Sequence, residues 1–180
     1  MAISGGRYDQ ESEAAMTAKI WLDMDGVFAD FDGHYEKHFG YRPVRWPLPD
    51  TTDYKLVNAL EGGFYRTIPV MDGIRELLDL VKVSGHPHSF LTGLPVSAPL
   101  TANEKVEWRD KHFPEVPIIC CPAKDKFMHG RPGDILIDDY LRYRVAWETM
   151  GGIFIHHTDV PSSIAQLREL GICARSSEGS

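Results

Sequence analysis

Short apolar runs alternate along the sequence with longer segments of helical periodicity, and this order restricts the fold more than any other feature. In residues 72–84, for example, the apolar residues Ile74, Leu77, Leu78 and Val81 fall on one helical face. The expected strands are 19–24, 88–92, 117–121, 134–138 and 152–156, and the expected helices are 72–84, 102–113, 140–150 and 160–171. Strands separated by helices favour an α/β fold, with a doubly wound, mostly parallel, Rossmann-like sheet covered by helices on both faces.

Residues 31–70 interrupt this alternation. They contain three prolines by position 49 and many aromatic residues, and their one clear helical pattern lies near 53–60. A segment of this length is too long for a simple crossover, so we interpret it as a small, mainly helical cap inserted after the first strand. A plain surface excursion is the alternative. The predicted organisation is an N-terminal arm (1–18), a core domain (19–30 and 71–171), the cap (31–70) and a C-terminal tail (172–180).

The charge and cysteine content limit the partners and the compartment. The formal net charge is -7 and no run of lysine or arginine occurs, which argues against nucleic-acid polymers and anionic membrane surfaces. The sequence contains no stretch of 18 apolar residues, so no transmembrane helix is predicted. The N-terminus lacks the apolar core of a signal peptide. Three cysteines, two of them adjacent (Cys120 and Cys121), form neither a disulfide framework nor a zinc motif. We therefore expect a cytoplasmic protein with reduced thiols.

Polar side chains follow three of the predicted strands. They are Asp23 and Asp25, Thr92 and Gly93, and Asp138 and Asp139. Because ligands of parallel sheets bind at the carboxyl ends of the strands, we expect these residues to form one site. Four carboxylates at one edge repel one another without a cation, and hard oxygen ligands suit Mg²⁺. Each motif alone is weak, since paired aspartates are also common in solvated turns and helix caps.

The motifs together resemble those of the haloacid dehalogenase-like phosphohydrolases. Asp23-Met24-Asp25-Gly26-Val27 is similar to the first motif of this superfamily, Thr92 to the second, Lys105 to the third and Asp138-Asp139 to the fourth. Within the superfamily, the sequence is most similar to the 5'(3')-deoxyribonucleotidases. The similar segments are DMDGVFADF (23–31), EKVEW (104–108), AKDK (123–126) and ILIDD (135–139).

The resemblance implies a phosphomonoesterase that forms an aspartyl-phosphate. Asp23 would be the nucleophile, and Asp25 would protonate the leaving alkoxide and then activate the hydrolytic water. The implied ligands of Mg²⁺ are the side chain of Asp23, the backbone carbonyl of Asp25 and the pair Asp138 and Asp139. The substrate would be a small phosphomonoester, and a homodimer is compatible with the family.

The resemblance also implies a phosphate-binding set. The hydroxyl of Thr92, the amide of Gly93 and the ammonium of Lys105 would hold the phosphoryl oxygens. Lys124 and Lys126 have two interpretations, because the AKDK segment either steers phosphate or forms an exposed loop.

Phe31 matches an aromatic position that stacks on the nucleobase in the deoxyribonucleotidases, so we expect it to bind substrate. Phe39, Tyr41, Trp46, Phe64 and Tyr65 would either complete an aromatic pocket or form the core of the cap. The sequence departs from the family at Gly93, where a serine is usual, and at Tyr140, where an arginine is typical.

Three other functions are compatible with parts of the pattern. They are a phosphatase of the same mechanism acting on another small phosphate such as a sugar phosphate, a phospho-acceptor signalling domain, and a catalytically silent binding module.

Overall fold

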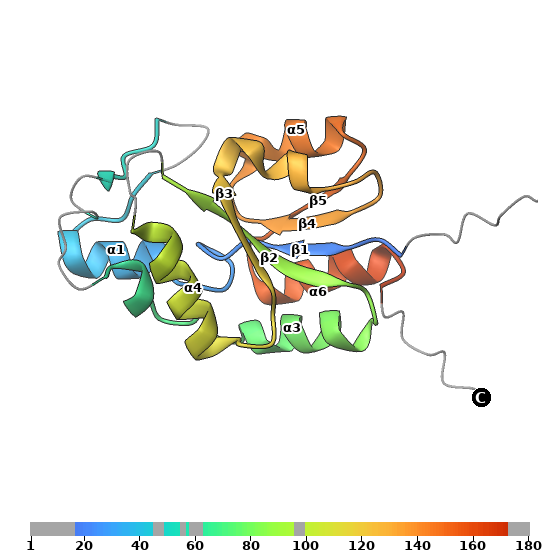
Figure 1. Ribbon diagram of the computed structural model, residues 1–180, viewed down its shortest axis with the longest axis horizontal. Coiled ribbons are helices and arrows are strands. Elements are labelled where there is room, and N and C mark those ends of the chain that lie inside the picture. The colour runs from blue at the N-terminus through green and yellow to red at the C-terminus, as the bar shows by residue number, and fades with distance from the viewer. Residues whose placement is uncertain (1–16, 45–48, 55–56, 58–62, 96–99, 173–180) are drawn as a thin grey trace, which may run out of the picture.

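The computed structural model describes residues 17–44, 49–54, 57, 63–95 and 100–172. Five parallel strands form one sheet, in the order β3-β2-β1-β4-β5. The strands are β1 (Ile20–Leu22), β2 (His88–Leu94), β3 (Ile118–Pro122), β4 (Ile135–Asp138) and β5 (Ile153–His156). This topology confirms the predicted α/β, Rossmann-like fold (Figure 1). None of the helices in the described ranges is long and apolar enough to cross a membrane.

The described helices cover both faces of this sheet, except α1, which lies beyond its end. They are α1 (Phe31–Phe39), α3 (Ile74–Val83), α4 (Thr101–His112), α5 (Arg144–Thr149) and α6 (Val160–Glu169). Ile20 and Leu22 of β1 belong to a core cluster that includes buried side chains of α3, α4 and α6. Trp21 points to the opposite face, where it clusters with Trp147 of α5. The period-two alternation of a short, fully buried strand therefore separates two apolar cores.

Two sequence-based expectations about helices are wrong. Residues 140–150 do not form one helix, because a 3₁₀ turn, η3 (Leu141–Tyr143), precedes the shorter α5. Helix α1 lies in the segment for which the sequence indicated no helix before position 53. Its ends nevertheless carry ordinary signals: the side chain of Asp30 accepts a hydrogen bond from the amide of Gly33, and Gly40 closes the helix with a φ of 80°. The expected helical pattern at 53–60, the N-terminal arm and the C-terminal tail lie largely outside the described residues.

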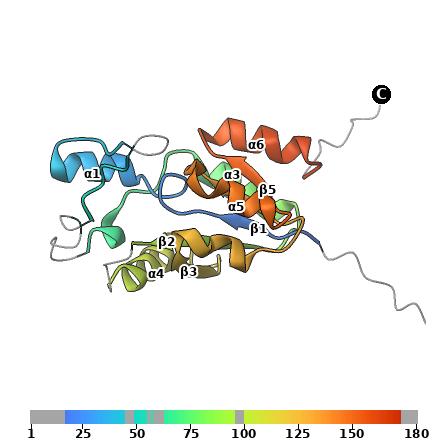
Figure 2. The ribbon, with the colours of Figure 1, turned by 90° about the horizontal axis from the view of Figure 1, so that it is seen from above.

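Helix α1 lies beyond the end of the sheet to which β1 leads (Figure 1). In both views, α1 is at the opposite end of the molecule from the start of β1 and the end of α6 (Figure 2). Other short 3₁₀ helices are η1 (Tyr65–Thr67), which precedes the return to the core, and η2 (Ala123–His129), which follows β3.

Backbone hydrogen bonds join the two ends of the 31–70 segment. The amide of Asp30 donates to the carbonyl of Pro69 at 2.9 Å, and the amide of Met71 donates to the carbonyl of Phe28 at 2.8 Å. Ala29 and Val70 form an antiparallel bridge between these bonds. The two ends of the segment therefore lie side by side.

Burial of His34 on α1 makes stability depend on pH. Burial, together with the nearby charges of His38 and Lys37, lowers the pKa of His34. Below the ordinary histidine value of about 6.5, the unfolded chain then binds more protons than the folded chain, so the free energy of unfolding falls as pH falls.

We expect the free energy of unfolding, measured with urea, to keep the contribution of neutral His34 above this pH and to lose it progressively towards pH 5. His34→Gln should reduce this slope, whereas His129→Gln, at an exposed position, should leave it unchanged; equal slopes in all three proteins would contradict the assignment.

Candidate active site

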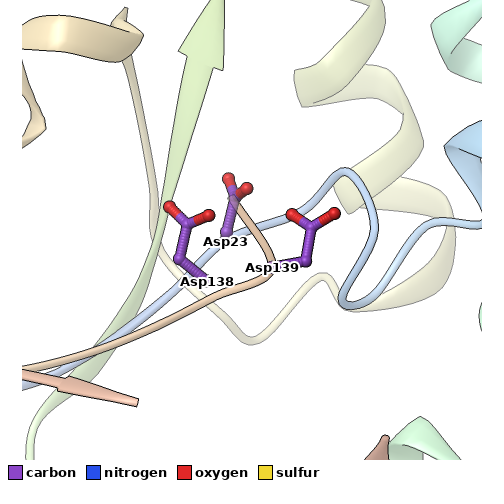
Figure 3. Close-up of side chains that lie close together, drawn as sticks. All are labelled: Asp23, Asp138 and Asp139. Atoms are coloured by element: carbon purple, nitrogen blue, oxygen red, sulfur yellow. The ribbon is translucent and has the colours of Figure 1, made fainter. Parts of the chain in front are cut away.

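Three carboxylates meet at the carboxyl ends of two neighbouring strands. Because Leu22 of β1 pairs with Ile137 of β4, the residues that follow them, Asp23 and Asp138, are adjacent. One oxygen atom from each of Asp23, Asp138 and Asp139 lies within 4.8 Å of the other two (Figure 3). Asp23 and Asp138 are buried, at 6% and 1% exposure. An oxygen-only, negatively charged donor set of this kind fits Mg²⁺.

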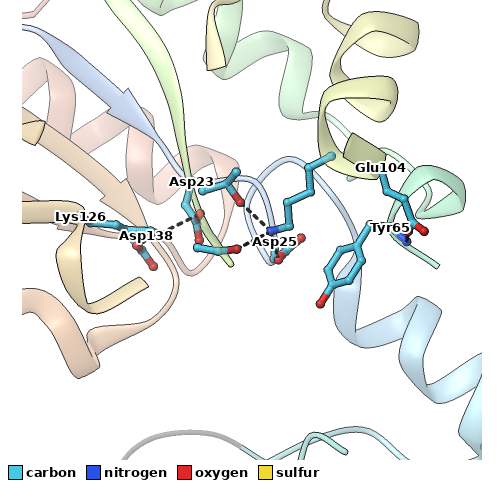
Figure 4. A network of polar contacts seen from close by, with 9 residues as sticks. Asp23, Asp25, Tyr65, Glu104, Lys126 and Asp138 are labelled. Atoms are coloured by element: carbon cyan, nitrogen blue, oxygen red, sulfur yellow. Dashed lines mark hydrogen bonds and ion pairs between the residues drawn. The ribbon is translucent and has the colours of Figure 1, made fainter. Parts of the chain in front are cut away.

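A buried lysine neutralises part of this acidic cluster. The ammonium of Lys126, on η2, is 2.8 Å from Asp23 Oδ1 and donates to Asp138 Oδ2 at 2.7 Å (Figure 4). Burial alone would lower the pKa of Lys126, but the charges of Asp138 and Asp23 and the hydrogen bonds to them raise it above its ordinary value. Burial raises the pKa of Asp23, and Asp138 adds to this effect while Lys126 opposes it.

Lys126 is the site residue whose place the sequence left undecided. Its 4% exposure excludes an exposed loop at this position. The neighbouring Lys124 is exposed and lines the pocket described below. The AKDK segment was the signal in the sequence for a lysine at the site. Which of its two lysines is buried there depends on the path of η2, which brings Lys126 to Asp138 of β4.

A second buried lysine organises the other polar group. Lys105, on α4, is 1% exposed and its ammonium donates to Asp25 Oδ2 at 2.6 Å, to Thr92 Oγ1 at 2.7 Å and to the carbonyl of Gly93 at 2.9 Å. The Thr92 hydroxyl accepts this bond, so its own proton is not used in it; Thr92 is 0% exposed and, unlike Gly93, is not among the residues that line the pocket. Asp25 Oδ1 has no hydrogen-bond partner among the described residues. The carboxylate of Asp25 is thus held by Lys105 and is not part of the three-carboxylate cluster.

Gly26 permits the close approach of the two acidic segments. Its φ is 82°, in the left-handed region, and a Cβ at this position would lie 2.0 Å from Asp139 Oδ2. The turn after β1 can therefore carry only glycine while Asp139 keeps its place.

A neighbouring side chain accounts for glycine rather than serine after Thr92. Thr92 and Gly93 lie within β2, which continues two residues beyond the expected strand. A Cβ on Gly93 would lie 2.7 Å from the Cβ of Ala123, a side chain that cannot rotate away. We expect Gly93→Ser to lower the free energy of unfolding by about 1–3 kcal/mol through overpacking. Urea denaturation of this variant and of Gly93→Ser combined with Ala123→Gly tests the contact, since the second change should restore stability; no recovery would contradict it.

A cavity of about 440 Å³ opens above these groups. Its lining combines the acidic and basic groups with aromatic residues of the 31–70 segment and with the turn after Asp139. The lining residues used below are Asp23, Asp25, Phe31, Tyr65, Gly93, Lys126, Asp138 and Asp139. The volume is in the range of small-molecule sites, and the lining combines charged groups with aromatic rings.

The aromatic residues of the 31–70 segment serve the core and the pocket together: Phe31 and Tyr65 belong to the core cluster and also line the pocket, whereas Tyr41 is exposed. The ring centroids of Phe31 and Tyr65 are 6.1 Å apart. Phe39 and Phe64 stack on each other at 6.2 Å, and the hydroxyl of Tyr41 is 2.7 Å from that of Tyr35. Trp46 lies outside the described residues.

The comparison with protein families agrees with the motifs. The model of the family described as "5' nucleotidase, deoxy (Pyrimidine), cytosolic type C protein" matches residues 17–151. A comparison with curated proteins finds no match. The matched range contains β1 to β4 and every polar residue of the site described above.

Proposed function

Because the chain belongs to the family of cytosolic type C 5'-nucleotidases, phosphoric monoester hydrolases of the haloacid dehalogenase-like type, we propose that it dephosphorylates deoxyribonucleoside monophosphates through an aspartyl-phosphate. The observation that carries this proposal is the position of Asp23. Its carboxylate lines the pocket, in contact with Lys126 and within 4.8 Å of the carboxylates of Asp138 and Asp139. A nucleophile of low basicity needs this neutralisation and in-line placement more than it needs a base.

In the first step, an oxygen of Asp23 attacks phosphorus and the bond to the ester oxygen breaks. Asp25 gives its proton to the departing alkoxide. In the second step, Asp25 takes a proton from water, the water oxygen attacks phosphorus, and the bond to Asp23 breaks to release phosphate. The ion pair with Lys105 at 2.6 Å holds one oxygen of Asp25, which leaves Oδ1 for the proton transfers.

The hydroxyl of Thr92 and the amide of Gly93 would bind the phosphoryl oxygens, and Lys105 would contribute its charge to the same site. Asp23, Asp138 and Asp139, with the backbone carbonyl of Asp25, would hold Mg²⁺, which when bound offsets the charge that builds up between Asp23 and the phosphate. Residues 31–70 would act as the cap that excludes water and contacts the leaving group. The family description supports a cytoplasmic location.

Phosphate release from a panel of compounds tests the proposal. The panel contains deoxynucleoside and nucleoside monophosphates, sugar phosphates and phosphoserine, each with Mg²⁺ and with a chelator. We expect chelator-sensitive turnover that is greatest for the deoxynucleotides. Turnover of a sugar phosphate alone would preserve the mechanism and overturn the substrate class. Activity that a chelator does not affect, or no activity on any compound, would overturn the magnesium phosphatase.

Phe31 tests the recognition of the base. Phe31→Ala removes a ring that lines the pocket, and stacking on a base is worth about 1–3 kcal/mol. We expect kcat/KM for a deoxynucleotide to fall by about 10-fold or more, while kcat/KM for 4-nitrophenyl phosphate changes far less. Because Phe31 is also 2% exposed and packed against Phe64, the ratio of the two substrates is the readout rather than either rate. An unchanged ratio would remove Phe31 from the base site.

A further inference from the structure

Helix α4 contacts the segment that returns from residues 31–70 at two buried points. Glu104 Oε2 accepts a hydrogen bond from the backbone amide of Tyr65 at 3.0 Å, and Trp108 Nε1 donates to the carbonyl of Ile68 at 2.7 Å. Glu104 and Trp108 are 9% and 0% exposed and lie four positions apart, on one face of the helix. The stretch from Tyr65 to Ile68 is thus hydrogen-bonded to α4 at its first and at its last residue.

The same helix carries Lys105, a buried lysine whose ammonium donates to Asp25 and to the carbonyl of Gly93, two residues that line the pocket. Lys105 follows Glu104, and its ammonium lies 5.1 Å from the centroid of the Tyr65 ring, a cation–π distance. Figure 4 shows Glu104 next to Tyr65, on the far side of Asp25 from the pair of Lys126 and Asp138. One turn of α4 therefore determines both where Lys105 meets Asp25 and where Tyr65 stands in the pocket wall.

The charge of Glu104 at the start of a helix does not by itself account for this arrangement. A carboxylate in a first turn gains from the helix dipole while it stays exposed to water. Glu104 is buried instead, and burial of a carboxylate is costly unless a donor compensates for it. The donor here is the amide of a residue 39 positions away. The bond therefore serves the placement of Tyr65.

We propose that Glu104 is a positioning residue that selects the leaving group of the substrate by fixing Tyr65 in the pocket wall. This inference rests on the proposed function, because it assigns the aromatic lining of the pocket to the nucleoside. Tyr65 and Phe31 both line the pocket, with ring centroids 6.1 Å apart, whereas the residues assigned to the phosphoryl group follow β1 or lie on β2 and α4. Without the Glu104 acceptor the backbone amide of Tyr65 loses its hydrogen bond, and we expect this to weaken contact with a nucleoside more than contact with the smaller 4-nitrophenyl phosphate.

Two substitutions separate the hydrogen bond from the volume of the side chain. Glu104→Met removes the acceptor at similar size, and Glu104→Gln keeps an oxygen that can accept from the Tyr65 amide. We expect the methionine variant to raise KM for a deoxynucleotide by about 3- to 10-fold, the worth of one hydrogen bond, and to change KM for 4-nitrophenyl phosphate less than about twofold. The glutamine variant should resemble the wild type. Glu107→Met is the matched control, because Glu107 lies on the same helix and forms a half-exposed ion pair with Arg66.

A second readout does not depend on activity. Amide hydrogen exchange of residues 63–68 should accelerate in Glu104→Met and stay slow in Glu104→Gln and Glu107→Met. In a Tyr65→Leu background, Glu104→Met should add no further change in the ratio of the two substrates. If the methionine variant does not fold, Glu104→Asp, which is one methylene shorter, gives the same comparison.

Three results would overturn the inference. They are wild-type exchange at residues 63–68 in Glu104→Met, an equal loss on both substrates, and faster exchange with unaltered KM values. Failure of the proposed function has a different appearance, because the wild-type protein would then not turn over nucleotides at all. The exchange experiment would still decide whether Glu104 fixes Tyr65.

Discussion

Asp23→Asn abolishes nearly all phosphate release, with kcat at least about 10³-fold below that of the wild type, as expected when a nucleophile is removed. The substitution keeps the size and shape of the side chain and replaces the carboxylate, whose oxygen attacks phosphorus, with an uncharged carboxamide. It also removes one of the two carboxylates that contact Lys126, so the fold should persist with Asp138 as the remaining partner. Phosphate release from the best nucleotide, measured with saturating Mg²⁺, gives the result.

Two further observations make this prediction specific. Rapid acid quenching of the wild type during turnover should leave phosphate on a peptide that contains Asp23, and the same peptide of Asp23→Asn should carry none. Asp110→Asn, an exposed carboxylate near the end of α4, is the control and should retain activity. Activity of Asp23→Asn within about tenfold of the wild type would contradict covalent catalysis by Asp23.

Lys126→Met produces the largest loss of stability that we expect from one substitution at the site. Lys126 contacts both Asp23 and Asp138, and all three side chains are at most 8% exposed. Without the ammonium, two buried carboxylates face each other unpaired, and breaking a buried ion pair in this way costs about 3–5 kcal/mol. Urea unfolding in the presence of a chelator measures this loss.

Metal and a neighbouring lysine provide the controls for Lys126→Met. A divalent cation replaces part of the missing charge, so Mg²⁺ should raise the free energy of unfolding of the variant more than that of the wild type. Lys124→Met changes an exposed lysine of the same segment and should alter stability by less than about 0.5 kcal/mol. A loss below about 1 kcal/mol for Lys126→Met, with no greater effect of Mg²⁺, would show that the pair does not stabilise the fold.

Some of the site could be predicted from the sequence because parallel pairing dictates it. Once the runs that end at Asp23 and Asp138 are assigned to neighbouring parallel strands, their side chains must emerge at the same edge, as they do. The unbroken apolar run of Ile20, Trp21 and Leu22 likewise indicates a strand buried on both faces, and all three are at most 4% exposed. These features depend on local periodicity and on one rule of topology.

Other features depend on contacts that no local pattern encodes. The place of Lys126 follows from the path of η2, a 3₁₀ segment with no periodic signal of its own. Helix α1 was missed because its buried face combines Phe31, His34 and Tyr35, which resemble pocket residues as much as a helical stripe. The bond between Glu104 and Tyr65 joins residues 39 positions apart, so only the folded chain brings them together.

The hydrogen-bonded junction at Asp30, Pro69 and Met71 has a consequence for how such a protein diversifies. Because the ends of the intervening segment already lie side by side, lengthening that segment costs little closure entropy, about 0.6 kcal/mol for each doubling. The whole segment can therefore be replaced by another, while the strands that position Asp23, Thr92 and Asp138 keep their register. Chimaeras that graft a foreign segment between Asp30 and Pro69 should therefore acquire new leaving-group preferences on an unchanged phosphoryl-transfer machinery.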